Sequence, residues 1–260
     1  MSDVTETFAC TIVLSYILVS GPWHCFCALK SDGRLFCWGL NSMGQLGNNS
    51  RGGSLVPVQE YTQATDWAQL SAGYRHSCAL KQDGRLFCWG KKTNYTPTEP
   101  IGYLGDGGTN GSLLPVQEYT AATDWLQVSA GRYHSCAVKK DGRIFCWGGN
   151  GSSGKLGNNS SEPIINVPVQ EYTEATDWFS VSAGFGNSCA LKHDGRMYCW
   201  GGSYERVPLQ TTAFSTWQSV TVGYNYRCGL VAGDRVFCFG SNTSGKLGTA
   251  SRQPVRPVEQ

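Results

Sequence analysis

Charged side chains are scarce in this sequence, and long apolar runs are absent. Lysine, arginine, aspartate and glutamate make up 15% of the 260 residues, and the formal net charge is +2. This weak charge argues against a nucleic-acid or anionic-membrane partner, because both are bound by clustered basic side chains. The apolar run over residues 8–21 is too short and too polar to span a bilayer. We therefore predict no nucleic-acid partner and no membrane span.

The same run lacks the start of a signal peptide. Residues 1–7, which precede it, are acidic, whereas a signal peptide begins with positive charge. Part of the run also belongs to the repeat described below. We therefore interpret it as a strand of the mature chain, and we expect Met1 to be the start of a fragment or a misassigned start.

Motifs for catalysis, cofactors and metals are missing as well. No Cys-x-x-Cys pair occurs, and the four histidines do not have zinc-finger spacings. Neither a Gly-x-Ser-x-Gly motif nor a phosphate loop is present. His76 and His134 occupy the same repeat position, where we expect hydrogen bonds to a neighbouring repeat. We predict a protein that is not an enzyme, with no catalytic residue, cofactor or metal.

Glycine, aromatic residues and cysteine are abundant instead. The 33 glycines and 12% aromatic residues indicate short strands joined by tight turns. Twelve cysteines outside metal sites are rare in a reducing cytosol. Asn-x-Ser/Thr acceptors support the same secretory route, and we predict a secreted, extracellular glycoprotein. The acceptors are Asn48, Asn94, Asn110, Asn150, Asn158, Asn159 and Asn242.

Five tandem copies of one repeat contain most of these residues. Each copy has two cysteines ten positions apart and an aromatic residue eleven positions before the first cysteine. We expect residues 1–260 to form a single repeat domain, with residues 1–15 completing the last blade or pairing with a neighbouring molecule. The units are approximately 16–66, 67–124, 125–177, 178–216 and 217–260.

The cysteines of each unit flank a short turn, such as Gln82-Asp83-Gly84. This is typical of a three-residue hairpin loop with glycine in the left-handed conformation. Such a loop places Cys78 opposite Cys88, within reach of a disulfide. Buried free cysteines and, less favoured, zinc ligands are the alternatives. The predicted pairs are Cys27 with Cys37, Cys78 with Cys88, Cys136 with Cys146, Cys189 with Cys199, and Cys228 with Cys238.

Two cysteines of the first unit, Cys10 and Cys25, have no repeat partner. A sixth disulfide between them is the simple interpretation. Pairing between molecules is the alternative.

The rest of each unit predicts further strands. Trp-Gly follows the second cysteine in four units, as at Trp38-Gly39, and then comes a loop such as Gly44-Gln45-Leu46-Gly47. A proline-led strand over residues 57–61 suits a sheet edge, where no ladder donor is needed. Each unit therefore predicts about four short strands, which is the sheet of one propeller blade.

From Tyr16 to Gln260 this pattern resembles the regulator-of-chromosome-condensation repeat, in the cysteine-rich form of secreted relatives and of plant receptor-kinase ectodomains. The resemblance implies a β-propeller, commonly with seven blades, whereas five units are present. We predict an all-β fold, a propeller of five four-stranded blades, each with a cross-strand disulfide. Unit four is short after Trp200-Gly201, and unit five inverts its turn to Gly233-Asp234.

The chain ends suggest how the ring closes. Residues 254–260 match the outer-strand segment that starts at Pro57. We expect the two termini to pair within one blade and close a five-bladed ring. The alternative is pairing between neighbouring molecules, which would grow into a fibre.

Binding is the predicted class of function. An aromatic residue follows the Ser-Ala-Gly strand of each unit, and these rings could stack on a sugar or a peptide or instead wedge between blades. They are Trp23, Tyr74, Tyr133, Phe185 and Tyr224. We favour an extracellular structural, adhesive or interaction scaffold with protein or glycan partners, its own copies and fibres included. The alternatives are a soluble lectin-like or receptor-like module and, less favoured, the guanine-nucleotide exchange that the resemblance suggests.

Overall fold

The computed structural model describes residues 16–20, 25–91, 102–202, 205–211 and 215–249. These residues form short β-strands, and no helix among them is long and apolar enough to cross a membrane. The strands fall into five blades, one for each repeat. They are β1 (Tyr16–Ser20), β2 (Cys25–Lys30), β3 (Leu35–Gly39) and β4 (Ser54–Gln59) in blade 1; β5 (Trp67–Ala72), β6 (His76–Lys81), β7 (Leu86–Gly90) and β8 (Ser112–Gln117) in blade 2; β9 (Trp125–Ala130), β10 (His134–Lys139), β11 (Ile144–Gly149) and β12 (Ile164–Gln170) in blade 3; β13 (Trp178–Ala183), β14 (Asn187–Lys192), β15 (Met197–Gly201) and β16 (Leu209–Gln210) in blade 4; and β17 (Trp217–Val222), β18 (Tyr226–Val231) and β19 (Arg235–Gly240) in blade 5.

Each blade is an antiparallel sheet whose strands pair in chain order. Blades 1 to 4 have four strands, as predicted. Blade 5 has three described strands, because residues 254–260, its predicted fourth strand, lie outside the described residues. The outer strand of blade 1 begins at Ser54, ahead of Pro57, and the proline sits where the pairing with β3 is irregular. An irregularity tolerates proline, since no ladder hydrogen bond is lost there.

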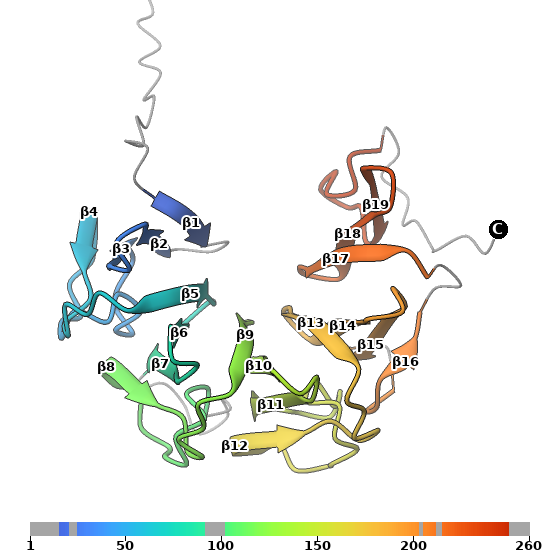
Figure 1. The fold of residues 1–260 in the computed structure, drawn as a ribbon, viewed down its shortest axis with the longest axis horizontal. Coiled ribbons are helices and arrows are strands. Elements are labelled where there is room, and N and C mark those ends of the chain that lie inside the picture. Colours follow the sequence, from blue (N-terminus) through green and yellow to red (C-terminus); the bar gives the residue numbers. More distant parts are fainter. Residues whose placement is uncertain (1–15, 21–24, 92–101, 203–204, 212–214, 250–260) are drawn as a thin grey trace, which may run out of the picture.

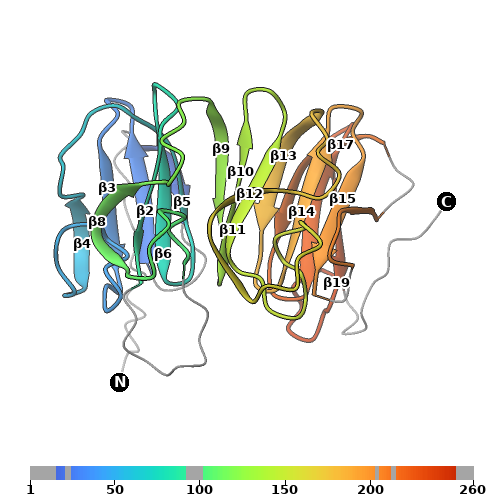
Figure 2. The same ribbon diagram turned by 90° about the horizontal axis from the view of Figure 1, so that it is seen from below.

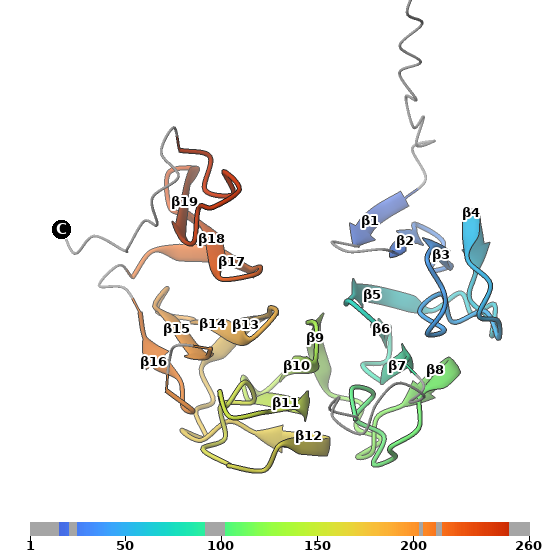
Figure 3. The same cartoon turned by 180° about the vertical axis from the view of Figure 1, so that it is seen from behind.

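The five blades stand side by side in an arc (Figure 1). Strands β5, β9, β13 and β17 line its inner side, and the blades stand upright in the view from below (Figure 2). Blades 1 and 5 lie at the two ends of the arc, with an opening between them that is also visible from behind (Figure 3). The described blades therefore do not close the expected five-bladed ring, because the packing between blades sets a curvature too small for five to complete a circle. The two terminal segments expected to pair lie outside the described residues.

The hairpin predicted from the Asp-Gly turns is confirmed. Cys78 lies directly opposite Cys88 in the β6–β7 pairing, and the two form a disulfide with a Cα–Cα distance of 4.1 Å. All five predicted pairs form in the same way. Gly84 has φ +84°, and a Cβ there would lie 2.3 Å from the carbonyl oxygen of Thr123. The turn therefore needs glycine both for its conformation and for its contact with blade 3.

The hydrophobic core lies between blades rather than within them. Each of four clusters joins one blade to the next. In the second cluster, the Cys78–Cys88 disulfide of blade 2 packs against Trp125, Val128 and Trp147 of blade 3. A single twisted sheet has two faces to bury, so every blade depends on its neighbours for cover.

A polar contact accompanies each of the first three clusters. The Gln45 carbonyl oxygen, in the Gly-x-Leu-Gly loop of blade 1, accepts hydrogen bonds from Trp89 Nε1 (2.8 Å) and Ser77 Oγ (3.0 Å) of blade 2. Tyr103 accepts in the same way from Trp147, and Lys155 from Trp200. We call this arrangement the loop–Trp contact. Blade 4 has no such loop, and Phe239 replaces the tryptophan in blade 5.

Candidate functional site

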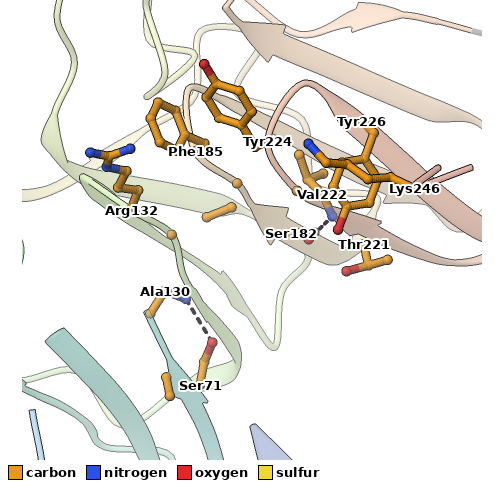
Figure 4. Close-up of a pocket in the computed structure, with 15 residues that line it drawn as sticks. Ser71, Ala130, Arg132, Ser182, Phe185, Thr221, Val222, Tyr224, Tyr226 and Lys246 are labelled. Atoms are coloured by element: carbon orange, nitrogen blue, oxygen red, sulfur yellow. Dashed lines mark hydrogen bonds between the residues drawn. The ribbon is translucent and has the colours of Figure 1, made fainter. Parts of the chain in front are cut away.

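The inner strands surround a cavity of about 820 Å³ (Figure 4). Small side chains form its walls, and larger ones come from the loops that follow these strands. Ser71 Oγ accepts from Ala130 N at 2.9 Å, and Ser182 Oγ accepts from Val222 N at 3.0 Å. These hydrogen bonds tie consecutive blades together at the inner side of the arc. The loops at the cavity mouth therefore start from fixed positions.

The loops themselves cross closely. Tyr74 N donates to the Gly131 carbonyl oxygen, and Arg132 N donates to that of Gly184. A Cβ on Gly131 would lie 2.5 Å from the Gly184 carbonyl oxygen, so a larger residue would separate the two loops. Glycine at this place in the repeat therefore brings the next side chain of each loop close to its neighbour.

The predicted aromatic face is partly assembled at this mouth. The ring centroids of Tyr133 and Phe185 are 5.7 Å apart, and those of Phe185 and Tyr224 are 4.4 Å apart, both in edge-to-face contact. Phe185 and Tyr224 line the cavity, whereas Tyr74 and Tyr133 contact Arg132 but do not line the cavity. Trp23, the fifth predicted member, lies outside the described residues.

Arg132 is the residue that the sequence interpretation missed. It occupies the repeat position of Tyr74, Phe185 and Tyr224, because blade 3 reads Gly-Arg-Tyr-His where blade 2 reads Gly-Tyr-Arg-His. In each blade this position directly follows a glycine, so comparing the residue after that glycine between blades would have identified Arg132, whereas a search for the nearest aromatic residue does not.

The Arg132 guanidinium lies among three rings. Its Cζ is 3.9 Å from the ring centroid of Phe185, 4.8 Å from that of Tyr74 and 4.7 Å from that of Tyr133. Cation–π contacts of this kind hold the side chain at the cavity. Its Nε is buried and has no hydrogen-bond partner among the described residues. No described carboxylate forms an ion pair with Arg132.

A second cation stands at the opposite side of the mouth. Lys246 Nζ lies 5.3 Å from the ring centroid of Tyr224 and 5.5 Å from that of Tyr226. Figure 4 shows Arg132 beyond Phe185 and Lys246 beside Tyr226. The described residues that line the cavity include these two cations and no carboxylate. The mouth is therefore both aromatic and positively charged.

The repeat histidines do not take part in this site. His76 Nε2 lies 2.7 Å from Ser135 Oγ, and His134 Nε2 lies 2.7 Å from Ser188 Oγ, so each binds the next blade as expected. Burial, with the nearby positive charge of Lys91, lowers the pKa of His76 to about 3. Burial likewise lowers the pKa of His134 to about 3. Both imidazoles are thus neutral structural groups at physiological pH.

The predicted glycan acceptors differ in accessibility. Asn150 and Asn242 are buried, and their side-chain nitrogens donate to Ser160 O and Thr249 Oγ1. Asn110 and Asn159 are exposed, Asn48 and Asn158 are half-buried, and Asn94 lies outside the described residues. A glycan on a buried nitrogen would replace its hydrogen bond, so the exposed acceptors fit glycosylation better.

Cys25 carries a buried thiol, and burial raises its pKa to about 11. Its predicted partner, Cys10, lies outside the described residues, so the sixth disulfide stays a prediction. No cluster of His, Cys, Asp or Glu in the described part of the chain could hold a metal ion.

Upright antiparallel blades around an axial cavity define a β-propeller, and the five described blades form an open arc. One model of the Regulator of chromosome condensation (RCC1) repeat matches residues 18–45, 67–95, 125–154 and 180–205, and a second model of the same repeat matches residues 32–80. The chain belongs to the RCC1 repeat family.

Similar proteins include chains of different kinds and lengths. The E3 ubiquitin-protein ligase HERC2 of Homo sapiens is 29% identical over 67% of this chain, which corresponds to 4% of that protein. The Ultraviolet-B receptor UVR8 of Arabidopsis thaliana is 30% identical over 55% of this chain and 31% of its own length. The chain thus spans less than a third of either relative. The structure of yeast RCC1 (Prp20) bound to Kap60 matches with a TM-score of 0.79 and 17% identity, over 94% of this chain and 60% of Prp20.

Proposed function

We propose that this chain is a non-enzymatic protein-interaction scaffold that binds its partner at the cationic and aromatic mouth of the axial cavity. The observation that carries the proposal is that Arg132 lies at the cavity without an acidic partner among the described residues. Three rings hold its guanidinium at the cavity, and no described carboxylate neutralises it. Arg132 is half-buried with a buried Nε, and an arginine partly removed from water normally has an acidic partner, because an unpaired charge away from solvent is costly. A ligand can supply that partner.

An acidic protein segment fits these groups. Arginine binds a carboxylate through two parallel hydrogen bonds, and its planar group keeps its contacts with the rings meanwhile. Phe185 and Tyr224 offer apolar surface beside it, and Lys246 adds a second positive charge. Relatives support a role in protein binding, since Prp20 is bound to Kap60 in one structure and its binding to Gsp1p and histones is the subject of another. A glycan stacked on the same rings is the alternative ligand.

The test uses fluorescein-labelled hexaglutamate as the probe, with hexalysine as its opposite. We expect hexaglutamate to bind and salt to weaken the binding, because part of the attraction is electrostatic. Arg132→Gln should weaken it by roughly 10-fold or more, since hydrogen bonds to a charged group contribute about 1.5–3 kcal/mol.

Arg143→Gln is the matched control. Arg143 carries the same charge but lies in an exposed turn, where it pairs with Asp141. Equal affinities of the Arg132 and Arg143 variants for hexaglutamate, or equal binding of hexalysine, would refute the acidic-segment proposal.

We further propose that the chain is secreted and extracellular. The five disulfides are compatible with that location. Glycosylation at the exposed acceptors Asn110 and Asn159 is part of this proposal. Treatment of native material with peptide N-glycosidase should lower its apparent mass and convert these two asparagines to aspartate. Unmodified peptides at both positions would contradict it.

A structural or adhesive role is the second candidate function. It requires contacts between copies of the chain, and the exposed apolar side chains of Val236 and Phe237 on blade 5 are compatible with such contacts. Electron microscopy of native material separates the two roles. Linear assemblies would support a structural role, whereas dispersed single particles would leave ligand binding alone. Nucleotide exchange is less favoured, because it takes place in the reducing compartments where disulfides are rare.

A further inference from the structure

We propose that the joint between blades 4 and 5 binds a small oxyanion, either an inorganic ion or the carboxylate of a small organic acid, and that Arg227 holds it. A joint is the region where two consecutive blades pack together. This joint lies inside the described arc, where β17–β19 stand beside blade 4 (Figure 1). The inference concerns a second site, apart from the proposed acidic-segment site in the axial cavity, and does not depend on that site.

The first three joints are closely packed. Between blades 1 and 2, the Gln45 carbonyl oxygen of the loop accepts hydrogen bonds from Ser77 and Trp89. Between blades 2 and 3, His76 Nε2 lies 2.7 Å from Ser135 Oγ. These serine, histidine and tryptophan side chains are at most 1% exposed. A loop, a serine, a histidine and a tryptophan are thus the parts from which the repeat builds a closed joint.

All four parts differ at the joint between blades 4 and 5. Blade 4 lacks the loop, and Phe239 replaces the tryptophan of the next blade. Asn187 occupies the position of His76, and Arg227 occupies the position of Ser77. The first three differences remove volume from the joint, whereas the fourth adds a long cationic side chain. The sequence therefore leaves space at this joint and places a positive charge beside it.

The space is a cavity of about 250 Å³ between the two blades. Arg227 and Asn187 line its inner part and are only 7% and 8% exposed. Gly202 and Asn225 also line it and are exposed, so they mark its opening to solvent. A water molecule takes up about 30 Å³, so the cavity has room for an ion of the size of sulfate or acetate together with water. It is too small for a folded segment of a partner protein.

The lining of this cavity is positively charged. Among the described residues that line it, Arg227 is the charged one and the others are neutral. Its guanidinium Cζ lies 4.5 Å from the ring centroid of Phe239, a cation–π contact on the flat face of the group. The N–H groups at the edge of a guanidinium bind two oxygens of an oxyanion through parallel hydrogen bonds. The amide of Asn187 adds further hydrogen-bond donors to the same lining.

Burial makes an anion favourable here. It lowers the pKa of Arg227 to about 10, so the guanidinium is still charged at neutral pH but less stabilised by water than an exposed arginine. A bound oxyanion would offset this loss of hydration. Charge, size and hydrogen-bond donors thus agree on the class of ligand.

The test is a titration of the ¹⁵N-labelled full chain with sodium sulfate and, separately, with sodium acetate, at an ionic strength held constant with sodium chloride. The backbone amide signals of Gly202 and Gly240, which both line the cavity, should shift and saturate. We expect a dissociation constant on the order of 1 mM for so small a ligand. The amide of Gly157, at the closed joint between blades 3 and 4, should not shift. Saturation by sulfate alone would identify an inorganic ion, and saturation by acetate alone an organic acid.

Two variants test the residues. Arg227→Ser restores the serine of the other blades and should weaken binding roughly 10-fold or more, because hydrogen bonds to a charged group are lost. Asn187→Asp keeps the size of the side chain and the arginine but adds a negative charge to the lining. It should abolish the saturating shifts, and it decides the question if Arg227→Ser does not fold.

Arg235→Ser is the matched control. Arg235 also belongs to blade 5 and its Cζ lies 5.6 Å from the ring centroid of Phe237, but it is exposed and does not line the cavity. This variant should bind sulfate and acetate like the parent chain. Arg132→Gln should do so as well, so failure here is distinguishable from failure of the acidic-segment proposal.

Two outcomes would overturn the proposal. One is the absence of a saturating shift at Gly202 and Gly240 with both probes, and the other is equal binding by the parent chain and the Asn187→Asp variant. Near-ultraviolet circular dichroism shows whether each variant is folded.

Discussion

At the scale of single residues, one position of the repeat has different chemical roles in different blades. Blade 2 has Tyr74 where blade 3 has Arg132, and this exchange changes an aromatic position into a charged one at the cavity. The two histidines, in contrast, repeat the same buried hydrogen bond to the next blade. The proposed ligand site therefore depends on a position where the repeat varies, whereas the hydrogen bonds between blades depend on positions where it does not.

The buried histidines predict how stability depends on pH. Their pKa in the folded chain is lowered to about 3, while unfolded histidine has a pKa of about 6.5. Between these values the unfolded state binds more protons, so the free energy of unfolding falls as pH decreases below about 6.5. The expected slope is about 1.4 kcal/mol per pH unit for each histidine.

Urea unfolding at pH 7, 6 and 5 measures this slope. His76→Asn, which copies Asn187 at the same position of blade 4, should lower the slope by about half of the two-histidine value. An unchanged slope in that variant would show that His76 is not the titrating group. Asp32, Asp83 and Asp141 do not interfere, because hydrogen bonds from the neighbouring arginines lower their pKa values below the ordinary aspartate range.

At the scale of the hairpin, each disulfide stabilises the fold in two ways, by closing a loop and by packing in the core. Comparison of different blades distinguishes the two contributions. Each closes a loop with the same sequence separation of 10, so the entropic stabilisation is similar everywhere, about 2.5–3 kcal/mol in the chain-entropy model. The packing contribution differs. Cys136 and Cys146 lie in a buried cluster, whereas Cys228 and Cys238 are only half-buried.

We therefore expect replacement of Cys136 and Cys146 by alanine to lower the free energy of unfolding more than replacement of Cys228 and Cys238. The difference should be about 1–2 kcal/mol, the effect of a small cavity in the core. Urea unfolding of the two double variants measures it. Peptide mapping without reduction must first show the five pairs, and free thiols at Cys78 and Cys88 would contradict the disulfide assignment.

Hairpins, disulfides and strands could be predicted because they depend on local spacing. The turn at Asp83-Gly84 fixes which residues lie opposite each other, and a separation of ten positions places the two cysteines together. The cavity mouth was predicted only in part. Phe185 and Tyr224 were found from their strand, but Arg132 required the alignment of one blade against another.

Ring closure could not be predicted for a different reason. The curvature of the arc results from packing between whole blades, such as that of Trp125 against the Cys78–Cys88 disulfide, and no local pattern encodes an angle. The loop–Trp contact also joins residues far apart in the chain, since Gln45 and Trp89 belong to different units.

At the scale of the whole molecule, stability is distributed along the arc. A blade in the middle is covered on both flanks, while blade 5 is covered on one. In such a linear array, local unfolding begins where a unit has the fewest neighbours.

Amide hydrogen exchange should reflect this gradient. We expect the amides of β18 to exchange faster than those of β10, although both are central strands of their sheets with the same hairpin and disulfide. Mass spectrometry of peptic fragments at a low chain concentration measures the two strands in one experiment. Equal protection of β10 and β18 under those conditions would mean that the arc unfolds as a single unit.

The loop–Trp contact also limits which unit can follow which along the chain. A unit that has the Gly-x-Leu-Gly loop is followed by one with tryptophan, and the unit without the loop is followed by phenylalanine. Gain, loss or exchange of whole units is therefore limited by the contacts between consecutive units rather than by residues inside each unit. Blade 3 could be duplicated in place, because it carries both the tryptophan that blade 2 requires and the loop that its own copy would need. Blade 4 could not be duplicated without placing its tryptophan after a unit that has no loop.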